Sequence, residues 1–231
     1  MASEAIRILS SMATKGVLEE LAPAFERASG VKVIAESIGG VDVNKRVKAG
    51  EAVDLVILAA HAIDALINES HLVTGSRVDL VTSGVAIAVR AGASRPDIGS
   101  EAAVKAAVLA AKTVGYSTGP SGVYLAKLFE RWGILEQIQA RIVVAPPGVP
   151  VGGLVARAEA ELGFQQLSEL IHQKGIDVIG VMPPAIQTIT TFSAGIAVAS
   201  KMPVTTVRAF LDFARSAAAA GAIRANGMEA A

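Results

Sequence analysis

The chain has 231 residues, 52% of them hydrophobic, which is enough to bury the core of one domain or of two small lobes. Its 21 basic and 21 acidic residues cancel, which argues against a nucleic-acid-binding surface, and the absence of cysteine excludes disulfides, thiolate metal sites and cysteine nucleophiles. Charges or glycines interrupt every apolar stretch before about 18 residues, so we expect no membrane insertion.

The N-terminal sequence MASEAIRIL enters a strand almost at once. It lacks the basic segment and the apolar segment of an export signal. Two interpretations stay open at this stage. A complete gene product of this sequence would be cytoplasmic, whereas a mature form with an added Met1 would have lost a signal and would be periplasmic.

Short β-branched runs alternate with helical runs along the first 90 residues, a pattern typical of an α/β fold with mainly parallel strands. Between the first two strands, a helix from Gly16 to Ser29 carries one apolar face, and Gly30 ends it. The remaining elements expected here are strands at 6–9, 31–36 and 53–59, short helices at 43–50 and 62–70, and a long extended segment at 79–90.

The same alternation continues to the C-terminus. Ser100 is the expected N-cap of a helix over 101–111, and Pro203 opens a last helix that we expect to continue to Gly227. The elements expected between them are strands at 113–117, 141–145, 163–166 and 176–184, helices at 118–133, 151–162 and 167–173, and an extended return segment at 190–200.

Two segments of the chain share one plan. The sequences ILSSMATKGVLEELAPAF and GYSTGPSGVYLAKLFERW each run from a strand through a serine-containing turn and a glycine into an apolar helix. This echo predicts two similar α/β lobes. Ligands of such lobes bind beyond the carboxyl ends of the strands, where the following helices begin.

The first of these turns has the composition of an anion-binding site. A helix N-terminus offers unpaired N–H groups and a partial positive charge. Ser10, Ser11 and Thr14 would add hydroxyl donors and Lys15 would add a charge, a combination that suits an oxyanion or a carboxylate. The structural alternative is that Ser11 or Thr14 is only a helix N-cap.

Four further turns resemble the first and strengthen the ligand interpretation. They are SIGGVDVNKR, STGPSGVY, PPGVPVGG and GFQQLSE, and they are divided between the two halves of the chain. Their convergence favours a ligand cleft between two lobes. The predicted ligand-binding residues are Ser10, Ser11, Thr14, Lys15, Gly39, Gly40, Val41, Ser121, Gly122, Val123, Gly152, Gly153, Gln165 and Gln166.

Competing motifs are missing from the sequence. It contains no P-loop, no G-x-G-x-x-G and no G-x-S-x-G, and its three histidines, at positions 61, 71 and 172, are not clustered with other metal ligands. We therefore expect no metal and no cofactor. Glu169 and His172, three residues apart on an expected helix, are either a general acid–base pair or part of a solvated face.

Four stretches together resemble the molybdate-type periplasmic binding proteins of type II fold: KGVLEELAPAFERASGVKV, VKAGEAVDLVILAAHAIDAL, SGVYLAKLFERWGI and RAFLDFARSAAAAGAIRANGMEAA. The resemblance covers nearly the whole chain. It implies two lobes, each a mainly parallel sheet flanked by helices, joined by two crossover strands and closing on a ligand. Lobe one would be residues 1–82 plus 190–231, and lobe two residues 83–189.

The sequence departs from the molybdate binders at two places. SIGGVDV has no serine after its glycines, and Gln165 and Gln166 stand where that family has a tyrosine. Amide side chains with helix N-termini suit a carboxylate better than a tetrahedral oxyanion. The chain is similar at least as much to the aconitate-isomerase branch of this wider group.

Three functions follow from the resemblance. The first is a binding module that holds a small organic anion and delivers it to a transporter or another partner. The second is an isomerase of an unsaturated di- or tricarboxylate, whose base would be Lys15, Tyr116, Tyr124, Glu169 or His172. The third, the effector domain of a transcription regulator, is disfavoured because no helix-turn-helix segment precedes the first strand. The fold alone does not decide between binder and enzyme.

Overall fold

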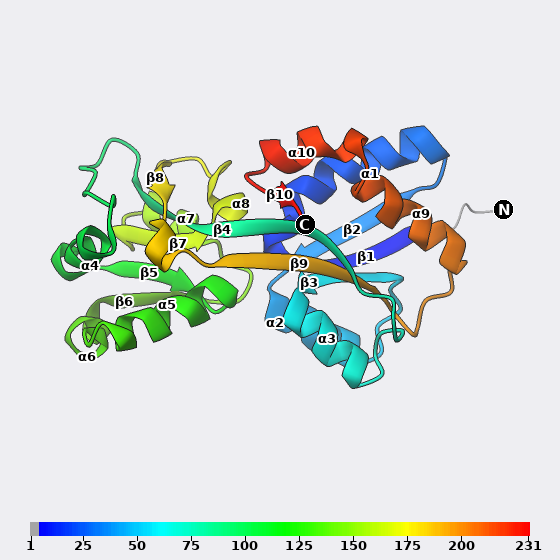
Figure 1. The fold of residues 1–231 in the computed structure, drawn as a ribbon, viewed down its shortest axis with the longest axis horizontal. Coiled ribbons are helices and arrows are strands. Elements are labelled where there is room, and N and C mark those ends of the chain that lie inside the picture. Colours follow the sequence, from blue (N-terminus) through cyan, green and yellow to red (C-terminus); the bar gives the residue numbers. More distant parts are fainter. Residues whose placement is uncertain (1–4) are drawn as a thin grey trace. The chain divides into compact units, whose positions relative to one another are not determined.

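The computed structural model describes residues 5–231, which form two compact units (Figure 1). Unit 1 contains the described residues up to Ser83 together with Thr191–Ala231, and unit 2 is Gly84–Thr190. The chain passes from one unit to the other within β4 (Val78–Arg90) and returns within β9 (Ile189–Ile196). The expected extended segment over 79–90 is confirmed, and these two strands are the crossovers of the fold.

The sheet of unit 1 is built around β1 (Ile6–Ser11). β1 runs parallel to β2 (Val33–Ile38) on one side and to β3 (Leu55–Ala59) on the other, and β3 pairs antiparallel with β9. β10 (Glu229–Ala230) adds a short antiparallel pair to the first half of β4. β1 is longer than the expected strand 6–9, because Ser10 and Ser11 stay in register with Ser37 and Ile38 of β2.

Helices cover both faces of the unit 1 sheet, because successive residues of a strand point to opposite faces and both faces carry apolar side chains. Ile6 and Ile8 of β1 belong to a core with α1 (Lys15–Ser29), α9 (Val204–Ala214) and α10 (Ala220–Ala225). Leu9 belongs to the opposite core with α2 (Gly40–Lys48) and α3 (Ala60–Asn68). Short 3-10 helices, η1 (Met12–Thr14) and η4 (Ala217–Ala219), precede α1 and α10.

The expectation of one continuous C-terminal helix is wrong. α9 ends at Ala214, Ser216 has extended backbone angles, and a separate α10 follows. The Ser216 hydroxyl donates to the Phe213 carbonyl at 2.7 Å, which competes with helical continuation at this point. Pro203 is the N-cap residue of α9 and not its first helical residue.

The sheet of unit 2 has the order β4-β7-β5-β6, with β8 (Ile176–Val181) on the other side of β4. β7 (Leu162–Gln166) is antiparallel to β4 and parallel to β5 (Val114–Ser117), which is parallel to β6 (Ile142–Ala145). Its helices are α4 (Glu101–Ala110), α5 (Pro120–Arg131), α6 (Leu135–Ile138), η2 (Gln139–Arg141), α7 (Val151–Ala156), α8 (Leu167–Leu170) and η3 (Pro184–Ile186).

Two of the helices expected in unit 2 are shorter in the structure. α7 ends at Ala156 and not at residue 162, since Ala158 has a φ of 60° and Leu162 already begins β7. α8 ends at Leu170 and not at residue 173. The expected N-cap is confirmed, because the Ser100 hydroxyl accepts the Ala103 N–H at 3.1 Å. Within residues 5–231, no helix has the length and apolar character needed to cross a membrane.

Candidate functional site

In unit 1, the carboxyl ends of β1 and β2 lie side by side at one edge of the sheet. The register pairs Ser10 with Ser37 and Ser11 with Ile38. The turn that leads into α1 and the glycine turn that leads into α2 therefore begin next to each other. The structure thus brings together the predicted unit 1 site residues, which are Ser10, Ser11, Thr14, Lys15, Gly39, Gly40 and Val41.

The three hydroxyl groups of this turn have different surroundings. Ser10 is fully buried, and its hydroxyl lies 2.7 Å from that of Ser37. Thr14 donates to the Ser11 carbonyl at 3.2 Å. The Ser11 hydroxyl is buried and has no hydrogen-bond partner among the described residues. Ser11 and Thr14 stand at the N-cap positions of η1 and α1, as the alternative expected, but neither side chain accepts a hydrogen bond from a helix N–H.

Neither Gly39, the N-cap residue of α2, nor Gly40, its first residue, has a backbone conformation that only glycine adopts. Gly39 has a φ of −56°, which any residue adopts, and a Cβ on Gly40 would meet only Leu58, at an ordinary 3.5 Å. The next residue, Val41, is exposed. Small residues here leave the first N–H groups of α2 open to approach. Lys15 is half exposed, with its ammonium 3.8 Å from a Glu19 carboxylate oxygen.

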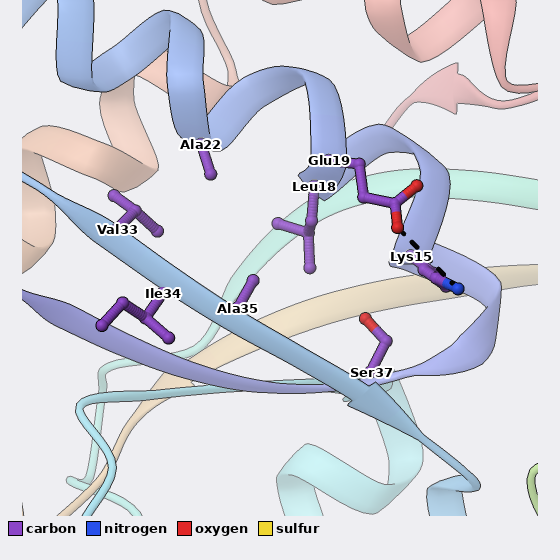
Figure 2. Close-up of a pocket in the computed structure, with 8 residues that line it drawn as sticks. All are labelled: Lys15, Leu18, Glu19, Ala22, Val33, Ile34, Ala35 and Ser37. Atoms are coloured by element: carbon purple, nitrogen blue, oxygen red, sulfur yellow. Dashed lines mark ion pairs between the residues drawn. The ribbon is translucent and has the colours of Figure 1, made fainter.

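A cavity of about 340 Å³ lies between α1 and β2 (Figure 2). Lys15 and Ser37 line it at the end near the serine turn, and Val33, Ile34 and Ala22 line it further along the strand. Most of its wall is apolar. Its composition does not suit a small anion, so the prediction of an anion site stays with the strand-end turns.

In unit 2, the predicted residues gather at the carboxyl ends of β5 and β7. Ser121 and Gly122 are buried in the first turn of α5, and Val123 beside them is exposed. A Cβ on Gly122 would overlap the carbonyl oxygen of Ser117, the last residue of β5. Gly122 is therefore needed to seat α5 against the end of its strand.

Gln165 connects two elements through both ends of its amide. Its Oε1 accepts the Val151 N–H at the start of α7 at 2.9 Å, and its Nε2 donates to Glu169 Oε2 at 2.6 Å. Gly152 has a packing role, because an added Cβ would lie 2.6 Å from Gln173 Cγ. Gly153 follows it in the buried first turn of α7.

Gln166 has one satisfied and one unsatisfied amide atom. Its Nε2 lies 2.8 Å from the Thr190 hydroxyl, whereas its Oε1 is buried without a partner among the described residues. Across residues 5–231, only the Ser11 hydroxyl and this amide oxygen are buried side-chain polar atoms without a partner. Each belongs to the last residue of a strand, β1 in unit 1 and β7 in unit 2.

Glu169 is the titratable group that the site perturbs most. Burial raises its pKa from 4.5 to about 7, although the hydrogen bond from Gln165 acts in the opposite direction. The acid–base pair with His172 is not formed, because α8 ends at Leu170 and His172 is exposed.

The two hydrogen bonds that connect Val151 through Gln165 to Glu169 were not predicted from the sequence. Their sequence signal is a glutamine at a strand end four residues before a glutamate.

The two tyrosines considered as bases are poor candidates. Burial raises the pKa of both Tyr116 and Tyr124 above the ordinary value. Tyr124 also donates its hydroxyl to the Ile186 carbonyl at 2.8 Å. Within the part of the chain that the structure describes, no group of three or more His, Asp or Glu side chains could hold a metal ion.

The chain forms two α/β units, passes between them twice and carries polar turns at the ends of the strands. These features define the type II periplasmic-binding-protein fold. A family model described as "Bacterial extracellular solute-binding protein" matches residues 6–229. The chain belongs to this family.

The chain is similar to an aconitate isomerase from Pseudomonas sp., with 39% identity over 97% of this chain and 87% of the relative. It is 21% identical to the molybdate-binding protein of Escherichia coli K12, over 93% of this chain and 85% of that protein. The periplasmic molybdate-binding protein of Azotobacter vinelandii has the same fold, with a TM-score of 0.79, 20% identity, and coverage of 96% of this chain and 98% of that one.

Proposed function

We propose that the protein binds a small organic anion carrying carboxylate groups at its strand-end turns, as a solute-binding protein does. The observation that carries the proposal is the pair of unsatisfied buried atoms, Ser11 Oγ and Gln166 Oε1. A buried polar atom without a partner costs about 1–3 kcal/mol, so native proteins rarely keep one without a reason. A ligand group that pairs with such an atom would remove that cost, an acceptor or donor for the Ser11 hydroxyl and a donor for the Gln166 amide oxygen.

The chemistry of the two residues favours an organic acid over a tetrahedral oxyanion. A serine hydroxyl donates readily to a carboxylate. The Gln166 amide can present either its oxygen or its nitrogen, because its neighbour, the Thr190 hydroxyl, both donates and accepts. An amide of this kind suits a ligand with both donors and acceptors, such as a hydroxy acid. An unprotonated oxyanion offers acceptors only.

A thermal-shift panel tests the ligand class. Citrate, the two aconitate isomers and small dicarboxylates would be compared with molybdate, sulfate and phosphate at equal concentration. We expect at least one carboxylate to raise the melting temperature, as a ligand that binds only the folded state does. Stabilisation by the inorganic oxyanions alone would overturn the proposal.

A second candidate function is isomerisation of an unsaturated carboxylic acid, favoured by the 39% identity to an aconitate isomerase across 97% of the chain. Such a reaction moves a proton and a double bond next to a carboxylate, and it needs a base beside the bound acid. Any carboxylate that stabilises the protein would be incubated with it and followed by NMR. New product signals support the enzyme, and an unchanged spectrum supports a binder that delivers its ligand to a transporter.

A further inference from the structure

We propose that the outer edge of β2 is a self-association surface, on which a second copy of this chain pairs its own β2 in the antiparallel direction. The inference goes beyond the proposed function and does not depend on the bound ligand. It rests on three features of β2: free backbone groups along its outer edge, an exposed isoleucine near its centre, and charges of opposite sign on either side of that isoleucine.

β2 is the outermost strand of its sheet. In the described chain it stands at one end of the strand order and pairs with β1 alone. The Lys32 carbonyl accepts the Ile6 N–H at 2.9 Å, and Ile6 is in register with Val33. In a parallel ladder, this arrangement turns the backbone groups of the even-numbered residues of β2 toward β1. The N–H and C=O groups of Val33 and Ala35 therefore point away from β1, to the open edge of the sheet.

The middle of this edge is not covered by α1. Val33 and Ala35 both line the cavity between α1 and β2 (Figure 2), and Ala35 is exposed there. Because successive strand residues alternate between faces, Ile34 belongs to the other face of the sheet, and it is 51% exposed. Proteins ordinarily protect an edge strand with charged side chains or a proline, so an exposed isoleucine at its centre calls for a partner.

The charges beside Ile34 match a second copy of the same strand. Lys32 and Glu36 lie on the same face as Ile34, two residues before it and two after it. An antiparallel pair with Ile34 on its two-fold axis sets Lys32 of each copy opposite Glu36 of the other. The same register sets Val33 opposite Ala35, so that their outward N–H and C=O groups bond across the pair. A pair centred on Ala35 would instead set Ile34 opposite Glu36, which is a poorer match.

Both charged side chains can take a further partner. Lys32 is exposed and forms no ion pair with any described residue. Glu36 and Glu51 both bind Arg46, so two carboxylates share one guanidinium. Arg7 of β1 lies near these carboxylates, but within residues 5–231 it forms an ion pair with neither. Lys32 of a second copy would therefore bring a positive charge to a glutamate side chain that is still 54% exposed.

Cysteine cross-linking tests the pairing, because the chain has no cysteine of its own. In Ile34→Cys the two thiols meet on the axis, where facing Cα atoms are about 4.5 Å apart, a separation that a disulfide spans. Val204→Cys is the matched control, since Val204 is also 51% exposed, at the start of α9. Under mild oxidation we expect Ile34→Cys to form covalent dimers at least about tenfold faster, because pairing raises the local thiol concentration. Equal rates would overturn the proposal.

Mixtures of cysteine variants test the register of the pair. Lys32→Cys and Glu36→Cys should each cross-link slowly alone and rapidly when mixed, since residue 32 of one copy faces residue 36 of the other. Rapid cross-linking of Ile34→Cys with Glu36→Cys would instead mean a pair centred on Ala35. That result would contradict the proposed pairing.

A proline variant tests the hydrogen bonds of the outer edge. Ala35→Pro removes an outward N–H, and edge strands tolerate proline, so the ladder between β1 and β2 should persist and a thermal melt should show a folded protein. In sedimentation velocity the wild type should form reversible dimers, weak ones because one pair of strands is a small interface. Ala35→Pro should weaken this dimerisation at least about tenfold, since each dimer loses two hydrogen bonds, whereas Ala35→Ser keeps the N–H and should not. A wild type that stays monomeric at millimolar concentration, or an Ala35→Pro variant that dimerises as the wild type does, would refute the self-association.

Discussion

Ser10 and Ser11 are neighbours on β1, and their hydroxyl groups have opposite surroundings. Ser10 bonds Ser37 across the strand pair, whereas Ser11 has no partner in the described chain. We expect Ser11→Ala to leave the free protein as stable as the wild type, because it removes an unsatisfied buried group. The same change should weaken binding of the carboxylate by about 1–3 kcal/mol, since the ligand loses its donor.

Thermal melting and isothermal titration measure the two effects of Ser11→Ala. Ser10→Ala is the informative contrast, because it breaks the bond to Ser37 and should destabilise the fold by about 0.5–1.5 kcal/mol. Ser94→Ala, in an exposed loop, should change neither quantity. Unweakened binding by Ser11→Ala would remove Ser11 from the ligand site.

The sequence located these polar turns, but it did not show which of their side chains form hydrogen bonds within the protein. Ser10 and Thr14 were expected to be free donors, and both hydroxyls bond within the protein. The partner of Ser10 is 27 residues away, on a neighbouring strand, where local pattern carries no information. The role of Gln165 was hidden for the same reason, because Val151 reaches it only through the packing of α7.

At the scale of elements, the glycine at the start of α5 is the sharpest prediction. Gly122→Ala should destabilise the protein strongly, because the new Cβ would overlap the Ser117 carbonyl oxygen and α5 would have to move away from β5. Gly221→Ala, in α10, is the control: nothing lies within 4 Å of its added Cβ. It should stabilise the protein by about 0.5–1 kcal/mol through helix propensity.

Urea denaturation of the two glycine variants measures the difference. Equal stabilities would mean that α5 can shift without cost.

Packing also explains which elements could be predicted from the sequence. Long helices such as α1 show their apolar face in the sequence, and the boundaries of α1 were predicted within one residue. The short α7 and α8 were overextended, because tertiary contacts end them. The N–H groups of Glu161 and Leu162 both bond the Thr113 carbonyl, which fixes where β7 begins.

At the scale of the whole molecule, the sequence shows two long extended segments, and the family resemblance implied that the chain crosses twice between α/β units along them, as β4 and β9 do. A long alternation of apolar and polar residues is a strong strand signal. A long strand without a hairpin turn inside it carries the chain away from the place where the strand begins. What the sequence could not predict is how burial changes the charge of the folded protein. That change depends on side chains gathered from distant segments.

Glu169 makes the stability of the whole molecule depend on pH in an unusual direction. Its pKa is about 7 in the folded protein, against an ordinary 4.5. Below pH 4.5 the carboxyl is protonated in both the folded and unfolded states and costs nothing. As pH rises from 4.5 to 7, the unfolded chain ionises first, so the folded state loses stability. Well above pH 7 the loss is complete, about 3 kcal/mol from the size of the pKa difference.

Glu169→Gln should abolish this loss because it keeps the shape of the side chain without the charge. Urea denaturation should give equal free energies of unfolding for variant and wild type near pH 4.5, and a more stable variant at pH 8. Carboxylates whose pKa is lowered by an arginine, such as Glu36 and Asp79, act on the acid side in both proteins and cancel from the comparison. Glu130 is exposed near the end of α5, so the control variant Glu130→Gln should have the stability of the wild type at both pH values. A constant difference between Glu169→Gln and wild type would mean that Glu169 titrates normally in the folded protein.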